Sequence, residues 1–426
     1  MKNKVTLPFI MMVSMLIITG MSLEAQDWAQ WRGPNREGIF KGANLNLDWA
    51  TKKPALFWTF RQAGAGYSAP TIVGNTLYCQ GADDTNDFAF ALDTQTGKVK
   101  WKQNLGPAYI SSDNRGNGGR GSITIDGNNL YLMRGGGQIA CLSATDGAIR
   151  WQKSSMEDFS GKNMNFSWGY SESPLVDGNL VICSPGGSDG TIIALDKNTG
   201  ATIWRSKELQ DDASYCSPII ANVNGFKMYV QLTAKNIVGV SAKDGKLLWK
   251  VAFEGSRVAA VIPTPIFVDN TIYVTNGYGV GCLLIKLTRS GDNINAETVY
   301  ANQNLSNQHG GVVLLNGNIY GYAESRNWVC QDIKTGEVIW RERGNDINKG
   351  SILCVNDRLI LLDMQTGLSA VIAASPEGWK EFGRMEIPER TKITTKDNFV
   401  WTHPVVANDK LYIRDHDLLF CFDLKK

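Results

Sequence analysis

Residues 193–204 of the chain read Ile-Ala-Leu-Asp-Lys-Asn-Thr-Gly-Ala-Thr-Ile-Trp. Asp196 is followed by Gly200 at four positions and by Trp204 at eight positions. A carboxylate or hydroxyl can accept hydrogen bonds from turn amides, and glycine tolerates the positive φ of a tight turn. The pattern therefore predicts two strands joined by a tight turn, with a tryptophan that fills a gap between layers. The same spacing occurs at Asp93, Gly97 and Trp101, at Ser143, Gly147 and Trp151, at Ser241, Gly245 and Trp249, and at Asp332, Gly336 and Trp340, with decayed copies at 286–300 and 373–382.

A second pattern alternates with the first along the chain. It places a turn residue four positions after a proline and an aromatic or aliphatic residue eight positions after it, as at Pro70, Gly74 and Tyr78. Short runs rich in Val, Ile, Leu and Tyr flank each turn, which predicts a β-hairpin. Proline is tolerated at the first position of a strand because it donates no ladder hydrogen bond there. Further copies begin at Ile123, Pro174, Pro218, Pro265, Val312, Ile352 and Pro404.

Each pair of hairpins makes a four-stranded antiparallel unit. The chain has 426 residues, so eight units take roughly 50 residues each, which is the size of a propeller blade. We therefore expect an all-β, eight-bladed β-propeller. Residues 421–424 lack a partner hairpin strand, and pairing them with residues 55–59 would close the ring and remove exposed edges. The tryptophans assigned to structural docking are Trp58, Trp101, Trp151, Trp204, Trp249 and Trp340.

The first residues have the features of a secretory signal. Lys2 and Lys4 precede an apolar run at residues 7–18, which is short for a membrane span, and a small-residue end follows at Ala25. No cysteine near Ala25 could carry a lipid anchor, so we expect a periplasmic or secreted monomer, with a retained N-terminal anchor as the alternative. The expected divisions are a signal peptide at 1–25, an N-terminal segment packing on the propeller at 26–54, and the propeller at 55–426.

Charge and cysteine content exclude several classes of protein. The chain has 43 basic and 41 acidic residues and a formal net charge of +2, which lacks the strongly basic face that nucleic-acid binding requires. The eight cysteines include no adjacent pair and no CxxC spacing. Cys141, Cys330 and Cys421 instead occupy one small-residue position in different blades, too far apart for a disulfide. We therefore expect structural free thiols.

The repeats resemble the tryptophan-docking repeats of the pyrroloquinoline-quinone (PQQ) dehydrogenase-like propellers. That superfamily includes quinoprotein alcohol dehydrogenases and a non-enzymatic outer-membrane assembly lipoprotein, BamB. The opening Asp-Trp-Ala-Gln-Trp-Arg-Gly-Pro at 27–34, and residues 168–174, 278–281 and 309–311, are similar to a group of exported PQQ-binding-like propeller repeat proteins. The resemblance implies the fold of the whole mature chain. It also implies PQQ with calcium as the cofactor of an enzymatic member, although the adjacent cysteine pair of those enzymes is missing here.

Functional residues are expected on one face of the ring. If the proline pattern supplies the two inner strands of each blade, both tight turns of the blade lie on the same face, the tight-turn face. The opposite face, here called the channel-mouth face, collects the connections between blades, where variable loops carry function. Arginines there fit anionic groups and a carboxylate or histidine fits a general base, whereas the alternative is a hydrated channel whose charges neutralise one another. The candidate ligand-binding residues are Arg115, Arg134, Trp168, Glu172, Tyr278, His309, Glu324, Arg326, Asp363, His403, Arg414, Asp415 and His416.

Three functions remain open at this point. The leading hypothesis is an exported propeller whose channel-mouth face binds a small molecule (sugar, polyol or quinone) or an envelope protein. The first alternative is a PQQ-dependent dehydrogenase acting on an alcohol, polyol or sugar, and the second is a BamB-like envelope assembly factor. No catalytic residue is assigned. The three histidines lack HxH or HxxxH spacing, so no metal site is predicted.

Overall fold

The repeat at residues 193–204 folds as its sequence pattern predicts. The computed structural model describes residues 27–164, 168–255 and 259–426, so the signal peptide expected at 1–25 lies outside the described residues. Within the quoted stretch, the carboxylate of Asp196 accepts a hydrogen bond of 2.9 Å from the amide of Thr199. The following glycine, Gly200, has a φ of 69°. The acid therefore caps the turn and the glycine makes the left-handed bend, as the pattern predicts.

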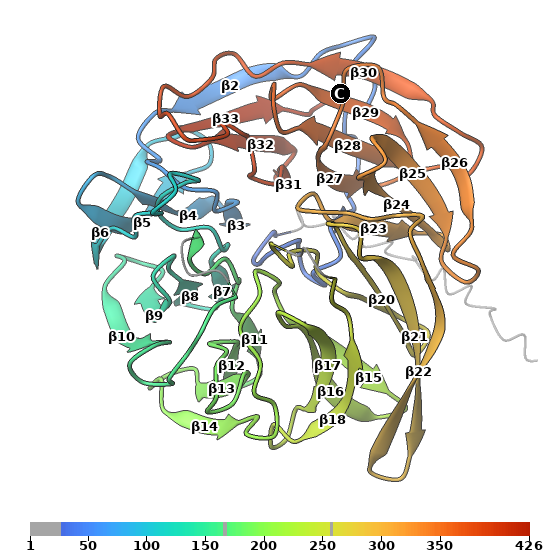
Figure 1. Cartoon of the computed structure of the whole chain (residues 1–426). Helices are drawn as coiled ribbons and strands as arrows, with labels where there is room; N and C mark the ends of the chain where they lie inside the picture. The colour runs from blue at the N-terminus through green and yellow to red at the C-terminus, as the bar shows by residue number, and fades with distance from the viewer. Residues whose placement is uncertain (1–26, 165–167, 256–258) are drawn as a thin grey trace, which may run out of the picture.

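In the described part of the chain, eight twisted sheets are arranged around a central axis and every regular element is a strand (Figure 1). Seven sheets have four strands, and one has a fifth strand added at its inner edge. Within seven of the sheets the four main strands pair antiparallel in chain order; in the eighth, β2 takes the outer place beside β33. This arrangement confirms the predicted all-β, eight-bladed propeller. We number the blades 1 to 8 in chain order, starting from the blade that contains β3.

The first half of the ring contains blades 1 to 4. Blade 1 consists of β3 (Thr71–Val73), β4 (Thr76–Ala82), β5 (Asn86–Asp93) and β6 (Val99–Pro107). Blade 2 consists of β7 (Thr124–Asp126), β8 (Asn129–Met133), β9 (Gln138–Ser143) and β10 (Ile149–Ser154). Blade 3 consists of β11 (Leu175–Asp177), β12 (Leu180–Cys183), β13 (Ile193–Asp196) and β14 (Thr202–Arg205). Blade 4 consists of β15 (Ile219–Val223), β16 (Phe226–Leu232), β17 (Asn236–Ser241) and β18 (Leu247–Ala252).

The second half contains blades 5 to 8. Blade 5 consists of β19 (Ile266–Val268), β20 (Thr271–Asn276), β21 (Gly281–Ser290) and β22 (Asn293–Asn302). Blade 6 consists of β23 (Val312–Leu315), β24 (Asn318–Ala323), β25 (Asn327–Asp332) and β26 (Val338–Glu342). Blade 7 consists of β1 (Ile39–Phe40), β27 (Gly350–Val355), β28 (Arg358–Asp363), β29 (Ser369–Ala373) and β30 (Glu381–Met385). Blade 8 consists of β31 (Val405–Ala407), β32 (Lys410–Asp415), β33 (Leu418–Asp423) and β2 (Ala55–Phe60).

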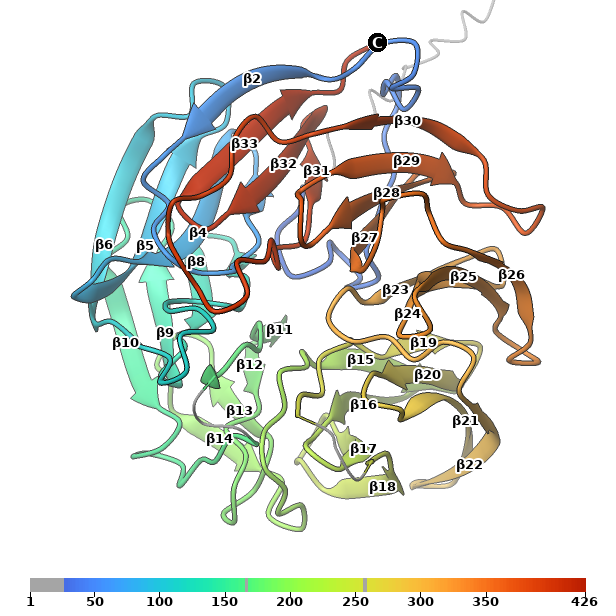
Figure 2. The same cartoon turned by 45° about the horizontal axis from the view of Figure 1, so that its top comes forward.

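Blade 8 combines strands from both ends of the described chain. The strand β2 pairs antiparallel with β33, with Trp58 opposite Cys421. Figure 2 shows β2 in blue lying along the red C-terminal strands. A strand from near the start of the chain thus completes a blade whose other three strands come from its end.

Tryptophans of the outer strands contact the turn of the following blade. The indole of Trp151 donates a hydrogen bond of 3.0 Å to the carbonyl of Lys197 in blade 3. A Cβ added at Gly200 would lie 2.8 Å from the same ring, so only glycine leaves room for it. Trp249 differs, because its indole donates instead to Met228 Sδ of its own blade. The turn that would receive Trp249 is replaced in blade 5 by the long β21–β22 hairpin, which joins the same apolar cluster.

The cysteines are packed inside the sheets. All eight lie within the described part of the chain, and each is buried and free of a disulfide. This result confirms the expected structural thiols. Among the described residues, none forms a helix with the length and apolar content needed to cross a membrane.

The N-terminal segment lies across the centre of the ring (Figure 1). Trp28 pairs with Ile72 on the innermost strand of blade 1. Arg36 is 3% exposed and donates hydrogen bonds to the carbonyls of Ser173 and Pro218, which precede the inner strands of blades 3 and 4. The segment therefore fills the middle of the propeller, and its guanidinium groups bind backbone carbonyls that no sheet pairs.

Candidate functional site

A cavity of about 230 Å³ opens on the channel-mouth face. Every connection between successive blades contributes to its wall, as do two turns within blades and the N-terminal segment. Because both tight turns of each blade lie on the other face, the cavity lies where the strand order predicts functional loops. Its lining residues are Trp31, Tyr67, Arg115, Arg120, Trp168, Ser171, Tyr215, Ser217, Ala260, Ile262, Tyr278, Gln308, His309, Lys349, Met364, Asp397, Phe399, Trp401 and His403.

Trp31 brings the N-terminal segment to the cavity wall. Its indole donates a hydrogen bond of 2.9 Å to the hydroxyl of Thr264, before the inner strand of blade 5. The ring of His403 packs on it edge to face, with centroids 4.7 Å apart. The segment that fills the channel thus also supplies an apolar surface of the cavity.

Aromatic rings make up much of the remaining wall. The rings of Tyr67 and Trp401 have centroids 5.1 Å apart, and Phe399 lies 5.8 Å from the same tryptophan. Across the cavity wall, Trp168 and Tyr215 have centroids 6.2 Å apart. Offset rings at these separations form stable contacts and present flat apolar faces.

One cationic group of the wall is neutralised by two carboxylates. Arg115 Nη1 lies 2.7 Å from Asp397 Oδ2, and Arg115 Nε lies 3.0 Å from Asp113 Oδ2. The indole of Trp168 also donates to Asp113, at 2.7 Å. These contacts link the connection between blades 1 and 2 to the connection between blades 7 and 8. The ion pairs of Arg115 therefore stabilise the cavity wall.

Two other cationic groups have no such partner. Arg120 donates one hydrogen bond of 3.0 Å to the carbonyl of Gly116, and its buried Nε has no partner among the described residues. Lys349 forms no ion pair with a described carboxylate; Glu324 acts on it only as a more distant charge. Burial lowers the pKa of both side chains. The cavity therefore has two cationic groups without a neutralising contact.

The histidines of the cavity are neutral at pH 7. Burial is the main cause, and it lowers the pKa of His403 to about 3 and that of His309 well below its usual value. His403 Nε2 lies 3.1 Å from the carbonyl oxygen of His309. Both ring nitrogens of His309 are buried without a hydrogen-bond partner among the described residues. A buried polar group without a partner is costly, so His309 has unused capacity for a ligand.

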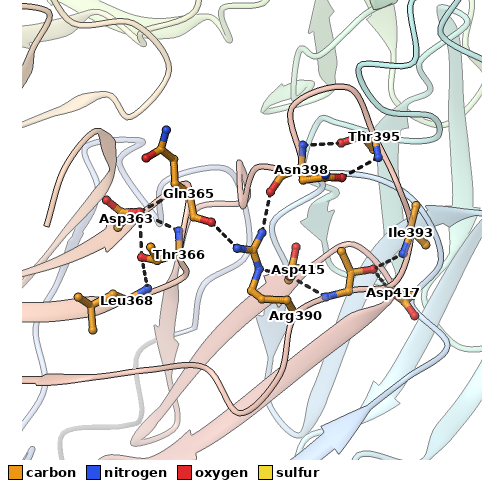
Figure 3. Close-up of polar contacts among 11 residues, drawn as sticks. Asp363, Gln365, Thr366, Leu368, Arg390, Ile393, Thr395, Asn398, Asp415 and Asp417 are labelled. Carbon is orange, nitrogen blue, oxygen red and sulfur yellow. Dashed lines mark hydrogen bonds and ion pairs between the residues drawn. The ribbon is translucent and has the colours of Figure 1, made fainter. Parts of the chain in front are cut away.

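The loop of residues 386–404, between β30 and β31, carries four of the lining residues. Figure 3 shows the contacts that hold its base. Arg390 Nε lies 2.7 Å from Asp415 Oδ2, and the same oxygen accepts a hydrogen bond of 3.0 Å from the amide of Thr391. The side chain of Asp415 is fully buried. Arg390 also donates to the carbonyl of Asn398, at 2.7 Å, which ties the base of the loop to its far arm.

The structure brings together five of the sequence-predicted ligand residues. These five, which all line the cavity, are Arg115, Trp168, Tyr278, His309 and His403.

Two predicted arginines lie outside the cavity, where they hold blades together. Arg134 pairs with Asp87 at 2.9 Å and is buried. Arg414 is fully buried and donates to the carbonyls of Ser68 and Gln80 at the junction of blades 8 and 1. In the sequence, each looks like a site residue because it is a charged residue at the end of an inner strand. In the structure, a carboxylate and main-chain carbonyls already bind their guanidinium groups.

The predicted acids and His416 also lie outside the cavity lining. Asp363 caps the turn between β28 and β29, where it accepts from the Thr366 amide at 2.8 Å. Glu324 accepts from the amide of Gly279 at 3.1 Å. His416 packs against Tyr67 with centroids 4.7 Å apart, and Asp415 anchors the 386–404 loop as described. Arg326 adopts a positive φ of 65° in the turn before β25.

Glu172 is buried and lies next to the lining residue Ser171 in the chain. Its carboxylate accepts a hydrogen bond of 3.0 Å from the Ser184 amide and one of 3.2 Å from the Gln231 side chain. Burial raises its pKa to about 8, which the hydrogen bonds from Ser184 and the charge of Arg36 partly oppose. This raised pKa marks an unusual environment without placing Glu172 in the cavity wall.

Sequence reasoning missed most of the cavity's charged and aromatic side chains. Arg120, Lys349, Tyr67, Trp401 and Asp397 all come from the connections that precede inner strands. The repeat register already placed these connections on the channel-mouth face. Examining every aromatic or charged residue of these connections would have found them, but the register alone does not tell which of them point inward.

The donor set of the cavity does not fit a calcium-assisted quinone. Calcium takes six to eight oxygen ligands, several of them carboxylates. The only carboxylate among the described lining residues is that of Asp397, and Arg115 holds it at 2.7 Å. No group of three or more His, Cys, Asp or Glu side chains with metal-binding geometry occurs in the described part of the chain. We therefore derive no step through PQQ and calcium.

Solved structures share the architecture at low sequence identity. A europium-containing methanol dehydrogenase superposes with a TM-score of 0.65 and 13% identity, covering 91% of this chain and 89% of that chain. BamB from Moraxella catarrhalis superposes with a TM-score of 0.60 and 16% identity, covering 87% of this chain and 98% of that chain. At these identities the likeness shows the fold alone.

Sequence comparison gives the family. BamB of Shewanella oneidensis is 20% identical over 371 residues, which is 78% of this chain and 79% of that protein. A tetrathionate hydrolase of Acidithiobacillus ferrooxidans is 27% identical over 248 residues, 52% of this chain and 44% of that protein. The family model described as outer membrane protein assembly factor BamB matches residues 85–342. Because this match takes in more than half of the chain, the protein belongs to that family of PQQ-repeat propellers.

Proposed function

We propose that the protein is an exported binding module that holds a small molecule in the channel-mouth cavity. The observation that carries this proposal is a cavity of about 230 Å³ into which every blade-to-blade connection sends a side chain. A hydrated channel whose charges neutralise one another is the alternative. The cavity's charges do not all neutralise one another, because Arg120 and Lys349 have no carboxylate in ion-pair contact among the described residues.

The cavity is preformed by contacts between its loops. Arg115 joins its own loop to Asp397 of the 386–404 loop, and Arg390 fixes the base of that loop on Asp415. Binding to such a wall loses little conformational entropy, since the side chains are already ordered. A preformed pocket of this kind suits a small ligand.

Export of the protein is the second part of the proposal. The charged start, apolar run and small-residue end of residues 1–25 support it. The relatives named outer membrane protein assembly factor point to the same compartment. Expression of the full chain in a bacterium, followed by fractionation, should give a periplasmic product whose N-terminus begins after Ala25. A cytoplasmic, uncleaved product would contradict export.

Ligand binding is tested by thermal shift and calorimetry with a panel of sugars, polyols, carboxylic acids and quinones. A ligand that binds only the folded state raises the melting temperature by mass action. Replacing Ile262, which lines the cavity, by Trp should abolish the shift by filling the space. The matched control replaces Ile220, which is 38% exposed on β15, by Trp and should leave the shift intact. A panel with no binder, or shifts that persist in Ile262→Trp, would overturn the proposal.

Envelope assembly is the second candidate function, and the family match over residues 85–342 favours it. It predicts that the protein co-purifies with components of an outer-membrane assembly complex from its native envelope. Substitution of Tyr278 and Trp401 at the channel-mouth face should then reduce co-purification. Recovery of the protein alone, with no assembly component, would exclude this candidate. The dehydrogenase alternative predicts dye reduction after reconstitution with PQQ and calcium, and absence of turnover would exclude it.

A further inference from the structure

We infer that residues 27–42 form a plug that closes the central channel, so that the cavity is a pocket with a single entrance on the channel-mouth face. This segment includes the motif at 27–34, which the repeat pattern leaves without a role. Three features of the described residues carry the inference, namely the path of the segment, its contacts with the blades and its burial. The inference does not depend on which ligand the cavity binds. A propeller plugged in this way passes nothing from one face to the other.

Both ends of the plug lie at the tight-turn face, and its middle reaches the cavity. At the start, Asp27 Oδ1 accepts a hydrogen bond of 2.9 Å from the amide of Gly74, in the turn between β3 and β4. At the end, the amide of Gly42 donates a hydrogen bond of 3.0 Å to the side chain of Asn356, in the turn between β27 and β28. Between these ends, Trp31 lines the cavity. The segment therefore enters the channel, turns back at the cavity and leaves by the face at which it entered.

Two glycines let the plug fold back on itself. Gly33 has a φ of 83°, and a Cβ added there would lie 2.8 Å from the ring of Trp28. Gly38 has a φ of 73°, and its amide donates a hydrogen bond of 2.9 Å to the carbonyl of Arg32. The two arms approach each other, since the rings of Trp28 and Phe40 have centroids 6.5 Å apart. The motif thus makes a compact loop, which fills more of a channel than one extended strand would.

The plug contacts an inner strand, or the residues just before one, in every blade. Its backbone bonds to Ile72 of blade 1 and to Ile125 of blade 2, and β1 pairs with β27 of blade 7. The guanidinium of Arg36 binds carbonyls of blades 3 and 4, and that of Arg32 binds a carbonyl of blade 6. Trp31 contacts blade 5 through its hydrogen bond and blade 8 through its ring. The plug is therefore joined to the whole circumference of the channel.

The side chains of the plug are buried, including its two charged groups. Trp28 is 2% exposed, Arg32 5% and Phe40 3%. In a water-filled channel the guanidinium groups would keep their hydration, whereas burial lowers the pKa of Arg32 and of Arg36 to about 10 each. Main-chain carbonyls bind these groups in place of water, as a buried charge requires. Such packing is expected of a segment that closes the channel.

Buried thiols beside the plug can report on it without any ligand. Arg36 lies within electrostatic range of the thiols of Cys183 and Cys216, whereas Cys141 and Cys330 lie in strands of blades 2 and 6. In the wild type we expect none of the four to react with iodoacetamide under native conditions. Arg36→Ala removes the hydrogen bonds to blades 3 and 4, so local opening should become easier. The alkylation rates of Cys183 and Cys216, measured by peptide mass spectrometry, should rise at least about tenfold, with Cys141 and Cys330 unchanged.

Arg134→Ala is the matched control. Arg134 is also buried and also binds main-chain carbonyls, but at the junction of blades 1 and 2. This variant should not expose Cys183 and Cys216 in preference to the other thiols. Trp31→Ala, which removes the contacts with blades 5 and 8, provides the same test as Arg36→Ala if that variant does not fold.

The outcomes of the alkylation experiment decide on the plug alone. Selective alkylation of Cys183 and Cys216 in the plug variants supports it. Uniform alkylation of all thiols, unchanged alkylation in the plug variants, or equal selectivity in Arg134→Ala would overturn it. None of these results bears on ligand binding, which the Ile262→Trp variant tests separately.

Discussion

The tight-turn face and the channel-mouth face of the propeller handle polar groups in opposite ways. On the tight-turn face, Asp93, Asp196 and Asp332 each accept hydrogen bonds from amides of their own turn. On the channel-mouth face, Arg120 and His309 keep buried nitrogen atoms without partners among the described residues. The repeated turn acids are therefore satisfied within their own turns, whereas Arg120 and His309, which lie in non-repeated connections, are not.

Removing a repeated tryptophan should have the largest effect on stability. Trp204 is 8% exposed and packs against the turn glycine Gly245 of the next blade. Truncation to Ala should lower the free energy of unfolding by about 3–5 kcal/mol, as for other buried aromatic residues. Ile203→Ala, at a neighbouring position that is 54% exposed, is the control and should cost less than about 1 kcal/mol. Chemical denaturation measures the free energy of unfolding of both variants. Equal stability of the two would contradict a stabilising role of the repeated tryptophan.

The buried acid Glu172 should make stability depend on pH. Burial raises the folded-state pKa of Glu172 from 4.5 to about 8. Between these values the native state binds more protons than the unfolded state, so stability falls as pH rises through this range and levels off above it. The limiting slope is about 1.4 kcal/mol per pH unit.

Glu172→Gln removes the titrating group and keeps the shape of the side chain. The variant should match the wild type near pH 4, below the unfolded-state pKa, and be the more stable protein at pH 8, as measured by denaturation at each pH. The opposite sign would mean that Arg36 holds Glu172 ionised, and the acid would then belong with the satisfied groups of the structure.

The sequence predicted the architecture far better than the site, for a physical reason. The pattern at residues 193–204 recurs along the chain with the same local geometry. The turn acid, the turn glycine and the tryptophan together therefore identify each blade. Strand order then fixed the face on which the cavity lies. The inward direction of a single side chain in a unique loop has no such redundancy.

Arg414 and Tyr278 illustrate that limit. Both lie at the ends of inner strands or in the turns after them, and the sequence predicts both as ligand-binding residues. The structure buries Arg414 among main-chain carbonyls and places Tyr278 in the cavity wall. Packing between blades, which depends on residues far apart in the chain, decides between the two outcomes. Whether a polar residue at the channel mouth is buried between blades or lines the cavity can therefore be decided only from the assembled ring.

The anchor of the 386–404 loop should have an intermediate effect. Asp415 accepts from Arg390 and Thr391, and Asp415→Asn removes its charge while keeping its size. We expect a loss of about 1.5–3 kcal/mol, the usual range for a hydrogen bond to a charged group. Faster cleavage within 386–404 by a protease of broad specificity should accompany it. Unchanged proteolysis would instead show that the contacts of Asp415 do not hold the loop.

The smallest effect on stability should come from the open cations of the cavity. Lys349 forms no ion pair with a described carboxylate, and burial lowers its pKa. Its ammonium is therefore partly desolvated on folding without gaining a carboxylate in ion-pair contact. Lys349→Met keeps the aliphatic stem and removes the charge, so the melting temperature should stay the same or rise slightly. Lys197→Met is the matched control, because its ammonium pairs with Asp126 at 2.7 Å and its loss should destabilise the protein slightly. If Lys349→Met proved less stable than Lys197→Met, the charge of Lys349 would stabilise the fold. Lys349 would then belong with the groups that have partners in the structure.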